Sequence, residues 1–186
     1  MNAPVDLTNV RIETERLILR SWKETDLHDF FEYASVEGVG EKAGWPHHRS
    51  LEESKKILAL FVAGKKTFAL ELKESGKVIG SLGLEPRDED AGLEPHLQGR
   101  EIGYVLSKDY WGRGLMPEAV NAAIAYCFQI LNFDYLTCGH FNHNDRSRRV
   151  VEKTGFRFLK NVMISTARGI DESGKLYVMY NPHKEK

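Results

Sequence analysis

The stretch REIGYVLSKDYWGRGLMPEAV, residues 100–120, constrains the fold more than any other part of the chain. A strand-like run passes through a turn with two glycines and leads directly into a helix-like run. The first amides of a helix lack acceptors within the helix, and the helix dipole adds partial positive charge there, so this order is an anion-binding architecture. Gly112 and Gly114 allow positive φ angles and close backbone approach, and Arg113 can add a charge-assisted contact. We predict a phosphate site at residues 111–114; the alternative is an ordinary loop before a proline-started helix.

Two common phosphate-binding motifs do not fit this turn. A Walker turn would need Gly-Lys-Ser/Thr after the glycines, and that sequence is missing. A dinucleotide-binding unit would need GxGxxG after an early strand, whereas this turn lies past the middle of the chain. The phosphate site must therefore belong to another fold.

Composition predicts one globular domain in the cytoplasm. The chain has 186 residues, of which 41% are hydrophobic, enough for one core. The formal net charge is −1 with acids and bases interspersed, which favours neither nucleic acid nor an anionic membrane as a partner. The N-terminal residues lack the pattern of a signal peptide, and no run approaches the ~18 apolar residues of a membrane span. Cys127 and Cys138 lie in apolar segments without CxxC spacing, so we expect reduced core thiols.

Strand and helix patterns are mixed along the whole chain, which indicates an α/β fold without internal repeats. Seven strands are predicted at residues 11–21, 67–73, 78–85, 100–107, 135–141, 156–164 and 175–180. Four helices are predicted from Thr25 or Asp26 to before Gly38, and over residues 50–64, 116–132 and 144–155. Ser50 and Glu53 have the spacing of a capping box, and residues 74–77 have turn chemistry.

Residues 86–99 form a long segment without periodicity, and such a loop in a compact domain is usually functional or mobile. It contains four acids, which are Asp88, Glu89, Asp90 and Glu94. This loop would attract a cationic substrate if it bordered an active site. A solvated acidic loop is the alternative.

Three blocks of the sequence resemble the GNAT superfamily of acetyltransferases, and within it the RimJ/RimL-like branch. They are TERLILR near the start, EIGYVLSKDYWGRGLMPEA in the middle, and N-x-x-S followed by RRVVEKTGF at residues 144–156. The resemblance implies the acyl-CoA N-acyltransferase fold, a mixed sheet of about seven strands with about four helices. It implies a domain over residues 10–165, closed by a C-terminal strand within 166–186. It also implies acetyl-CoA as co-substrate, with a primary amine attacking it directly in a ternary complex.

The resemblance also assigns residues to the cofactor. The pyrophosphate signature Gln/Arg-x-x-Gly-x-Gly/Ala maps onto residues 111–116, and Trp111 and Met116 depart from it at the first and last positions. The strand at residues 102–106 is expected to separate from the next strand, so that pantetheine pairs with its backbone. Asn144 is expected to hydrogen-bond the pantetheine arm, although an asparagine at a helix start is equally a good N-cap. The cofactor-binding residues implied are Tyr104, Val105, Leu106, Trp111, Gly112, Arg113, Gly114, Leu115, Met116, Asn144, Ser147 and Arg149.

Acetyl transfer needs a base, because an alkylamine with a pKa near ~10 is protonated at neutral pH. Glu101, at the entry of the strand beside the expected thioester, is the first candidate, and a surface ion pair is the alternative. His140 on the following strand is the second candidate. His140 and His143 have no third partner at metal-ligand spacing, so we predict no metal.

The leaving thiolate has a pKa near ~8.5 and needs little assistance. Many superfamily members place a tyrosine seven residues after the asparagine, and here that position is Val151. Ser147 is the hydroxyl that the RimJ/RimL-like branch offers instead, so we assign it a hydrogen bond to the sulfur. A backbone amide near Val105 or Leu106 would meet the oxygen of the tetrahedral intermediate. In the basic cluster Arg146, Arg148 and Arg149, one side chain could reach the 3′-phosphate.

The sequence does not choose the acceptor amine. A polyamine, an aminoglycoside or a basic peptide N-terminus all fit an acidic entrance, and Trp45 with residues 47–49 lies in the region that forms acceptor sites in this superfamily. One alternative is a catalytically inactive CoA-binding regulatory domain. Another is a self-associating protein without a cofactor site, and a homodimer is left open.

Overall fold

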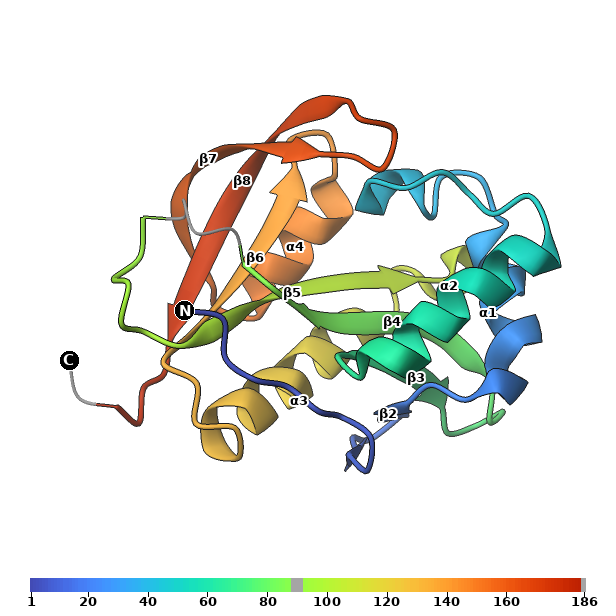
Figure 1. The fold of residues 1–186 in the computed structure, drawn as a ribbon, viewed down its shortest axis with the longest axis horizontal. Helices are drawn as coiled ribbons and strands as arrows, with labels where there is room; N and C mark the ends of the chain where they lie inside the picture. Colours follow the sequence, from blue (N-terminus) through green and yellow to red (C-terminus); the bar gives the residue numbers. More distant parts are fainter. Residues whose placement is uncertain (88–91, 185–186) are drawn as a thin grey trace.

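The computed structural model describes residues 1–87 and 92–184, and within them eight strands form one mixed sheet (Figure 1). The strand order is β1-β2-β3-β4-β5-β6-β8-β7. The central pair β5–β6 is parallel, and the neighbouring pairs on both sides are antiparallel. The strands are β1 (Arg11–Glu13), β2 (Leu17–Ser21), β3 (Thr67–Leu72), β4 (Val78–Glu85), β5 (Gly99–Leu106), β6 (Tyr135–Phe141), β7 (Arg157–Ser165) and β8 (Asp171–Tyr180).

Four α-helices in the described residues cover both faces of the sheet. They are α1 (Leu27–Ala34), α2 (Leu51–Gly64), α3 (Leu115–Gln129) and α4 (Asp145–Lys153). Side chains alternate between the two faces of a strand, and β3 shows the division. Phe68 and Leu70 belong to the core cluster that contains α3, whereas Ala69 belongs to the cluster that contains α1 and Leu58 of α2. We call these the α3/α4 face and the α1/α2 face.

The predicted mixed α/β fold is confirmed, but one strand prediction is wrong. Residues 11–21 form a tight hairpin of two antiparallel strands instead of one strand, which brings the strand count to eight. The turn is held by Glu118 in the first turn of α3. Its carboxylate accepts hydrogen bonds from Thr14 Oγ1 at 2.6 Å and from Arg16 N and Nε at 2.8 Å. This partner lies about a hundred residues away in the chain, so a local pattern could not predict the turn.

Both ends of the described chain pack into the same sheet. Ala3 and Leu7, ahead of the expected domain boundary at residue 10, are buried in the core cluster that contains α3. At the other end, β8 lies between β6 and β7. The predicted acids Asp88, Glu89 and Asp90 lie outside the described residues, and Glu94 is exposed. No helix in the described ranges is long and apolar enough to cross a membrane.

We predict that Glu118→Ala destabilises the protein by about 1.5–3 kcal/mol, because three donors lose a charged acceptor. Burial raises the pKa of Glu118, but the hydrogen bonds from Thr14 and Arg16 outweigh it and lower the pKa below 4.5. The carboxylate therefore contributes stability above pH 4.5, and this contribution is lost as the pH falls through the lowered pKa.

Urea unfolding of wild type and variant across a descending pH series measures this effect. The control is Glu52→Ala, since Glu52 is also an acid in the first turn of a helix but is exposed. We expect the control to change stability by less than about 0.5 kcal/mol. Equal losses in both variants would contradict the role of Glu118.

Candidate active site

The sheet opens in its middle, between β5 and β6. The two strands pair along residues 99–102 of β5, where Ile102 lies opposite Cys138. Beyond that point residues 103–106 of β5 pair with β4 alone, and residues 139–141 of β6 pair with β8 alone. We call this opening the seam. The strand separation expected at residues 102–106 is confirmed.

Alternate backbone N–H groups of β5 point into the seam. Ser107 N donates to Ile79 O, at 2.8 Å, and therefore points toward β4. Backbone N–H directions alternate along an antiparallel strand. The amides of Leu106 and Tyr104 accordingly point into the seam, and the amide of Val105 points toward β4.

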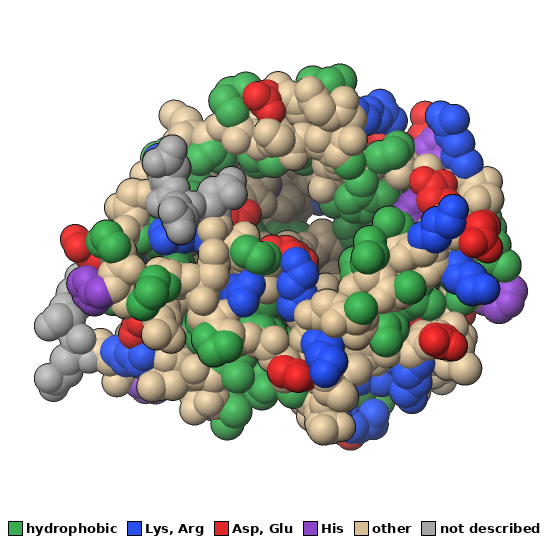
Figure 2. Space-filling view, in the orientation of Figure 1, with side chains coloured by type: hydrophobic (Ala, Val, Ile, Leu, Met, Phe, Trp, Pro, Cys, Tyr) green, Lys and Arg blue, Asp and Glu red, His purple; other side chains and the backbone are tan. Residues whose placement is uncertain are grey.

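A cavity of about 400 Å³ lies between the seam, the turn at residues 111–114 and α4, and Figure 2 shows the surface hollowed near the middle of the molecule. Most of the predicted site residues line it. They are Glu101, Tyr104, Val105, Leu106, Trp111, Gly112, Gly114, Leu115, Met116, His140, Asn144, Ser147 and Arg149. The structure brings these residues together, and their individual roles stay predictions.

Arg113 is the predicted site residue that does not line the cavity. Its guanidinium lies over the ring of Tyr110, with Cζ 5.2 Å from the ring centroid. Its carbonyl accepts a hydrogen bond from Arg16 Nη1 at 2.9 Å. Arg113 therefore packs along the outside of the turn.

The turn itself needs glycine for conformational reasons. Gly112 and Gly114 both have φ of +78°, and Gly114 is the residue from which α3 begins. A Cβ on Gly112 would meet nothing within 4 Å, and one on Gly114 would meet only Arg16 Nη2 at 3.6 Å. The turn thus presents an open backbone surface beside the cavity at a helix N-terminus, as the anion-binding prediction requires.

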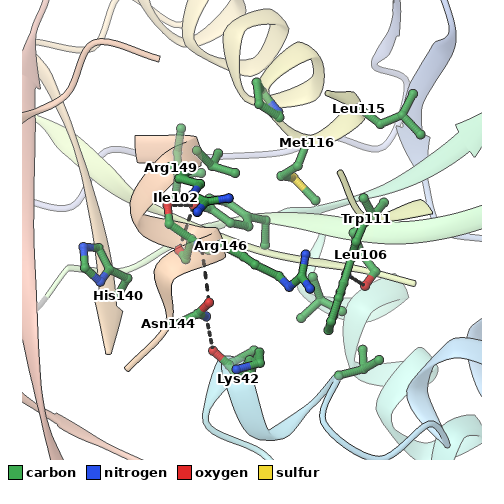
Figure 3. Close-up of a pocket in the computed structure, with 18 of the residues that line it drawn as sticks. Lys42, Ile102, Leu106, Trp111, Leu115, Met116, His140, Asn144, Arg146 and Arg149 are labelled. Atoms are coloured by element: carbon green, nitrogen blue, oxygen red, sulfur yellow. Dashed lines mark hydrogen bonds between the residues drawn. The ribbon is translucent and has the colours of Figure 1, made fainter. Parts of the chain in front are cut away.

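Trp111 and Arg146 meet across the cavity (Figure 3). Trp111 Nε1 donates to Leu106 O at 2.7 Å, which fixes the indole against the end of β5. Arg146 reaches from α4, and its Cζ lies 4.6 Å from the indole centroid, within the range of a cation–π contact. Arg146 is therefore a cation held at the cavity beside the glycine turn.

Helical spacing explains which basic residues of α4 face the cavity. Arg146, Arg149 and Lys153 line it, three and four residues apart along one side of the helix. Arg148 instead forms ion pairs with Asp145 and Glu152, each at 3.1 Å. The same periodicity, applied to the predicted cluster of Arg146, Arg148 and Arg149, would have added Lys153 and excluded Arg148.

Asn144 joins α4 to a distant segment. Its Oδ1 accepts a hydrogen bond from Ser147 N at 3.2 Å, so the N-cap interpretation is confirmed. Its Nδ2 donates to Lys42 O at 3.0 Å (Figure 3). The side chain is 7% exposed and lines the cavity.

Residues 38–49, which we call the strap, cross from the α1/α2 face to the far side of the seam. Lys42 and Ala43 of the strap line the cavity, and Gly44 O accepts a hydrogen bond from Ala167 N at 2.7 Å. The sequence prediction placed Trp45 and residues 47–49 in an acceptor region but did not anticipate the contacts of Lys42 and Ala43. No local pattern marks those residues, because their partners lie on α4 and the β7–β8 connection.

Glu41 organises the strap from within. Its carboxylate accepts from Gly38 N at 2.7 Å and His47 N at 3.0 Å, and lies 2.8 Å from His47 Nδ1. Burial raises the pKa of Glu41, but these hydrogen bonds outweigh burial and lower it to about 2. Glu41 therefore stays ionised as a structural anion of the strap.

The two candidate bases lie on opposite faces of the sheet. Glu101 shares the α1/α2 face with Val105, and Thr137 Oγ1 donates to Glu101 Oε2 at 3.3 Å. His140 shares the α3/α4 face with Cys138 and is 4% exposed. Its Nδ1 lies 2.9 Å from Phe141 O, so that nitrogen carries a proton. Its Nε2 lies 3.3 Å from the hydroxyl of Tyr177.

The histidines considered for metal binding have separate partners. His143 Nδ1 lies 3.5 Å from Glu172 Oε2, and its ring stacks on Phe141. His140 is bonded as described above. In residues 1–87 and 92–184, no three His, Cys, Asp or Glu side chains gather as metal ligands.

The hydroxyl expected near the leaving group has a close neighbour. Ser147 Oγ lies 2.8 Å from the hydroxyl of Tyr104 on β5. Val151, one turn further along α4, is buried in the core cluster that contains α3. Val151 has no hydroxyl, but the cavity near it contains the hydroxyls of Ser147 and Tyr104, which are in contact.

The family and curated relatives agree with this geometry. A family model described as an acetyltransferase (GNAT) domain matches residues 16–157. The chain is 26% identical over 151 residues to an uncharacterized N-acetyltransferase, YoaA, of Bacillus subtilis, covering 78% of this chain and 82% of the relative. It is 28% identical over 176 residues to a probable N-acetyltransferase, YjcK, of the same species, covering 88% and 87%.

Solved structures share the fold. A GNAT-family acetyltransferase from Bacillus anthracis aligns with a TM-score of 0.79 at 22% identity, covering 92% of this chain and 99% of that chain. A ribosomal-protein-S5-alanine acetyltransferase from Vibrio fischeri aligns with a TM-score of 0.71 at 23% identity, covering 96% and 100%.

We predict that two substitutions of Asn144 separate its two contacts. Asn144→Asp keeps the acceptor for Ser147 N but turns a carboxylate oxygen toward Lys42 O, so the strap contact is lost at a cost of about 1 kcal/mol while the cap remains. Asn144→Ala loses both contacts and costs about 1–2 kcal/mol. Urea unfolding measures these changes, and hydrogen exchange measures the strap amides, which we expect to exchange faster in both variants. Unchanged strap exchange in the aspartate variant would contradict the link.

Proposed function

The chain belongs to the GNAT acetyltransferase family, and on that premise we propose that it moves the acetyl group of acetyl-CoA to a primary amine by direct attack in a ternary complex. One observation carries the proposal: the part of β5 that no longer pairs with β6 adjoins an open glycine turn at the N-terminus of α3. An extended amide chain can pair with the first, and a pyrophosphate can bind the second. Both features border one cavity.

The residues present fit acetyl-CoA. The backbone groups of Tyr104 and Leu106 are directed into the seam, where pantetheine amides would bind. The amides at the start of α3 would hold the pyrophosphate, and Arg146, Arg149 and Lys153 would supply charge for the phosphates. When bound, acetyl-CoA supplies an acetyl thioester with a good leaving group. The amide of Leu106, rather than that of Val105, would donate to the acetyl oxygen as it gains negative charge.

Glu101 is the better placed of the two bases. It lies on the α1/α2 face, the face from which the strap approaches the cavity, and it lines that cavity. An amine that enters beneath the strap would meet this carboxylate and lose its proton to it, directly or through water. His140 lies on the other face with both ring nitrogens in contact with protein groups. We therefore propose Glu101 as the general base.

The acceptor is proposed as a class. The three motif blocks favour the RimJ/RimL-like branch, and the Vibrio fischeri neighbour is named a ribosomal-protein-S5-alanine acetyltransferase. A protein N-terminal amine is therefore a substrate to test beside small polyamines and aminoglycosides. The competing proposal is a CoA-binding domain without transferase activity, which Val151 in place of the usual tyrosine would suit.

We predict that Gly114→Ala weakens acetyl-CoA binding by about tenfold or more. The left-handed φ costs an alanine about 1–2 kcal/mol, so the turn shifts away from the geometry that directs its amides. Gly76→Ala is a matched control, because Gly76 has φ of +70° and open space around it in the β3–β4 turn. Calorimetric titration measures binding, and urea unfolding measures stability. Equal stability losses with equal dissociation constants would refute the pyrophosphate site.

A panel of amines tests the reaction itself. We expect wild-type protein to release CoA from acetyl-CoA with at least one of a polyamine, an aminoglycoside and short N-terminal peptides. Glu101→Gln is expected to lower kcat about a hundredfold with the KM for acetyl-CoA little changed. The control is Glu85→Gln, since Glu85 lies opposite Glu101 on β4 but does not line the cavity. Acetyl-CoA binding without turnover for any amine would favour the inactive domain.

A further inference from the structure

The contact between Tyr104 and Ser147 supplies hydroxyl groups near Val151, which has none. Ser147 lies in the first turn of α4 and lines the cavity, and Tyr104 lines it from the separated part of β5. Their hydroxyl oxygens are 2.8 Å apart, and the Tyr104 hydroxyl also donates to the backbone carbonyl Ser147 O at 3.3 Å. This short contact therefore joins β5 on one side of the seam to α4 on the other.

We propose that Tyr104 is a positioning residue that orients the Ser147 hydroxyl toward the sulfur of the acyl donor. The proposal rests on the function proposed above for this cavity. The tyrosine hydroxyl and the serine hydroxyl together take the place of the single tyrosine that many superfamily members carry at the position of Val151.

The hydrogen-bonding capacity of the two groups supports this role. A serine hydroxyl has one proton and can accept from other donors. The Tyr104 proton has two acceptors within reach, and Ser147 Oγ at 2.8 Å is nearer than Ser147 O at 3.3 Å. When Tyr104 donates to Ser147 Oγ, the Ser147 proton is left to donate to another acceptor at the cavity. A donor that is itself hydrogen-bonded is polarised and binds its own acceptor more strongly. A hydrogen bond stabilises the negative charge that develops on the sulfur, and no proton need leave Tyr104.

Burial keeps Tyr104 in the state that this role requires. Burial, with a smaller contribution from the Cys138 thiol, raises the pKa of Tyr104 well above its ordinary value, although the Ser147 contact opposes the shift. The phenol therefore remains protonated through the working pH range. It acts as a neutral donor and not as a base that would compete with Glu101.

The test uses CoA itself as the probe and needs no knowledge of the acceptor. The thiol pKa of protein-bound CoA is measured from the ultraviolet absorbance of the thiolate, as a difference between protein with CoA and protein alone. Burial raises the pKa of both Cys127 and Cys138, so the protein thiols do not ionise in the same range. A hydrogen bond to sulfur stabilises the thiolate, so wild-type protein should lower the CoA thiol pKa below about 8.5.

Three variants and a control decide the outcome. Tyr104→Phe keeps the ring and should reduce the ionisation constant of bound CoA about threefold, with its dissociation constant near pH 7 changed less than twofold. Ser147→Ala should do the same or more. The double variant should match Ser147→Ala, because Tyr104 acts through Ser147. Tyr126→Phe is the control, since Tyr126 lies on α3 against Phe68 and does not line the cavity.

Each contrary result overturns a defined claim. A CoA thiol pKa in Tyr104→Phe equal to that of wild type, or effects that add in the double variant, would overturn the role of Tyr104. A wild-type protein that binds CoA without lowering its thiol pKa would overturn the hydrogen bond from Ser147. A wild-type protein that does not bind CoA would instead overturn the proposed function of the cavity.

Discussion

Backbone groups that lose their partners when two parallel strands separate must find others, and in this protein that requirement shapes the site. β5 and β6 pair as far as Ile102 and then separate, which leaves the β5 groups of Tyr104 and Leu106 directed into the seam. Trp111 satisfies one of them, since its Nε1 donates to Leu106 O. The others face the cavity, where an extended amide ligand can pair with them. The cavity therefore lies where the hydrogen bonds between β5 and β6 end.

Long-range contacts hold the two sides of this gap in place. Asn144 connects the start of α4 to Lys42 of the strap, and Arg146 connects the same helix to Trp111 in the turn that precedes α3. Glu118 fixes the first turn of α3 to the β1–β2 hairpin. These contacts place the N-termini of both helices beside the seam. The positive end of α3 and the cationic side chains of α4 thus lie where the proposed cofactor would carry its phosphates.

The sequence predicted correctly those elements whose structure depends on residues that are close together in the chain. The helices α2, α3 and α4 and the strands β3 to β6 follow from apolar spacing, glycine turns and capping residues. The candidate cofactor residues were placed by one contiguous run and one short motif, and all but Arg113 line the cavity. Arg146 was a candidate for the 3′-phosphate, whereas Lys153 was available from helical spacing but was not selected. The hairpin at residues 11–21 and the strap contacts were missed, because their partners are distant in the chain.

The sequence by itself therefore determined the helices, the strands outside residues 11–21, the mixed α/β class and the glycine turn from which α3 begins. Periodicity and glycine conformation act within a few residues, so a local pattern is enough for these features. Only the tertiary structure decided which side chains share a face. It separated Glu101 from His140 across the sheet and brought Tyr104 to Ser147. Those relations depend on strand register and helix docking, which join residues far apart in the chain. The glycine turn could be recognised in the sequence because the anion binding proposed for it needs only backbone groups. The groups that would act on the acetyl donor and the amine come together only in the folded structure.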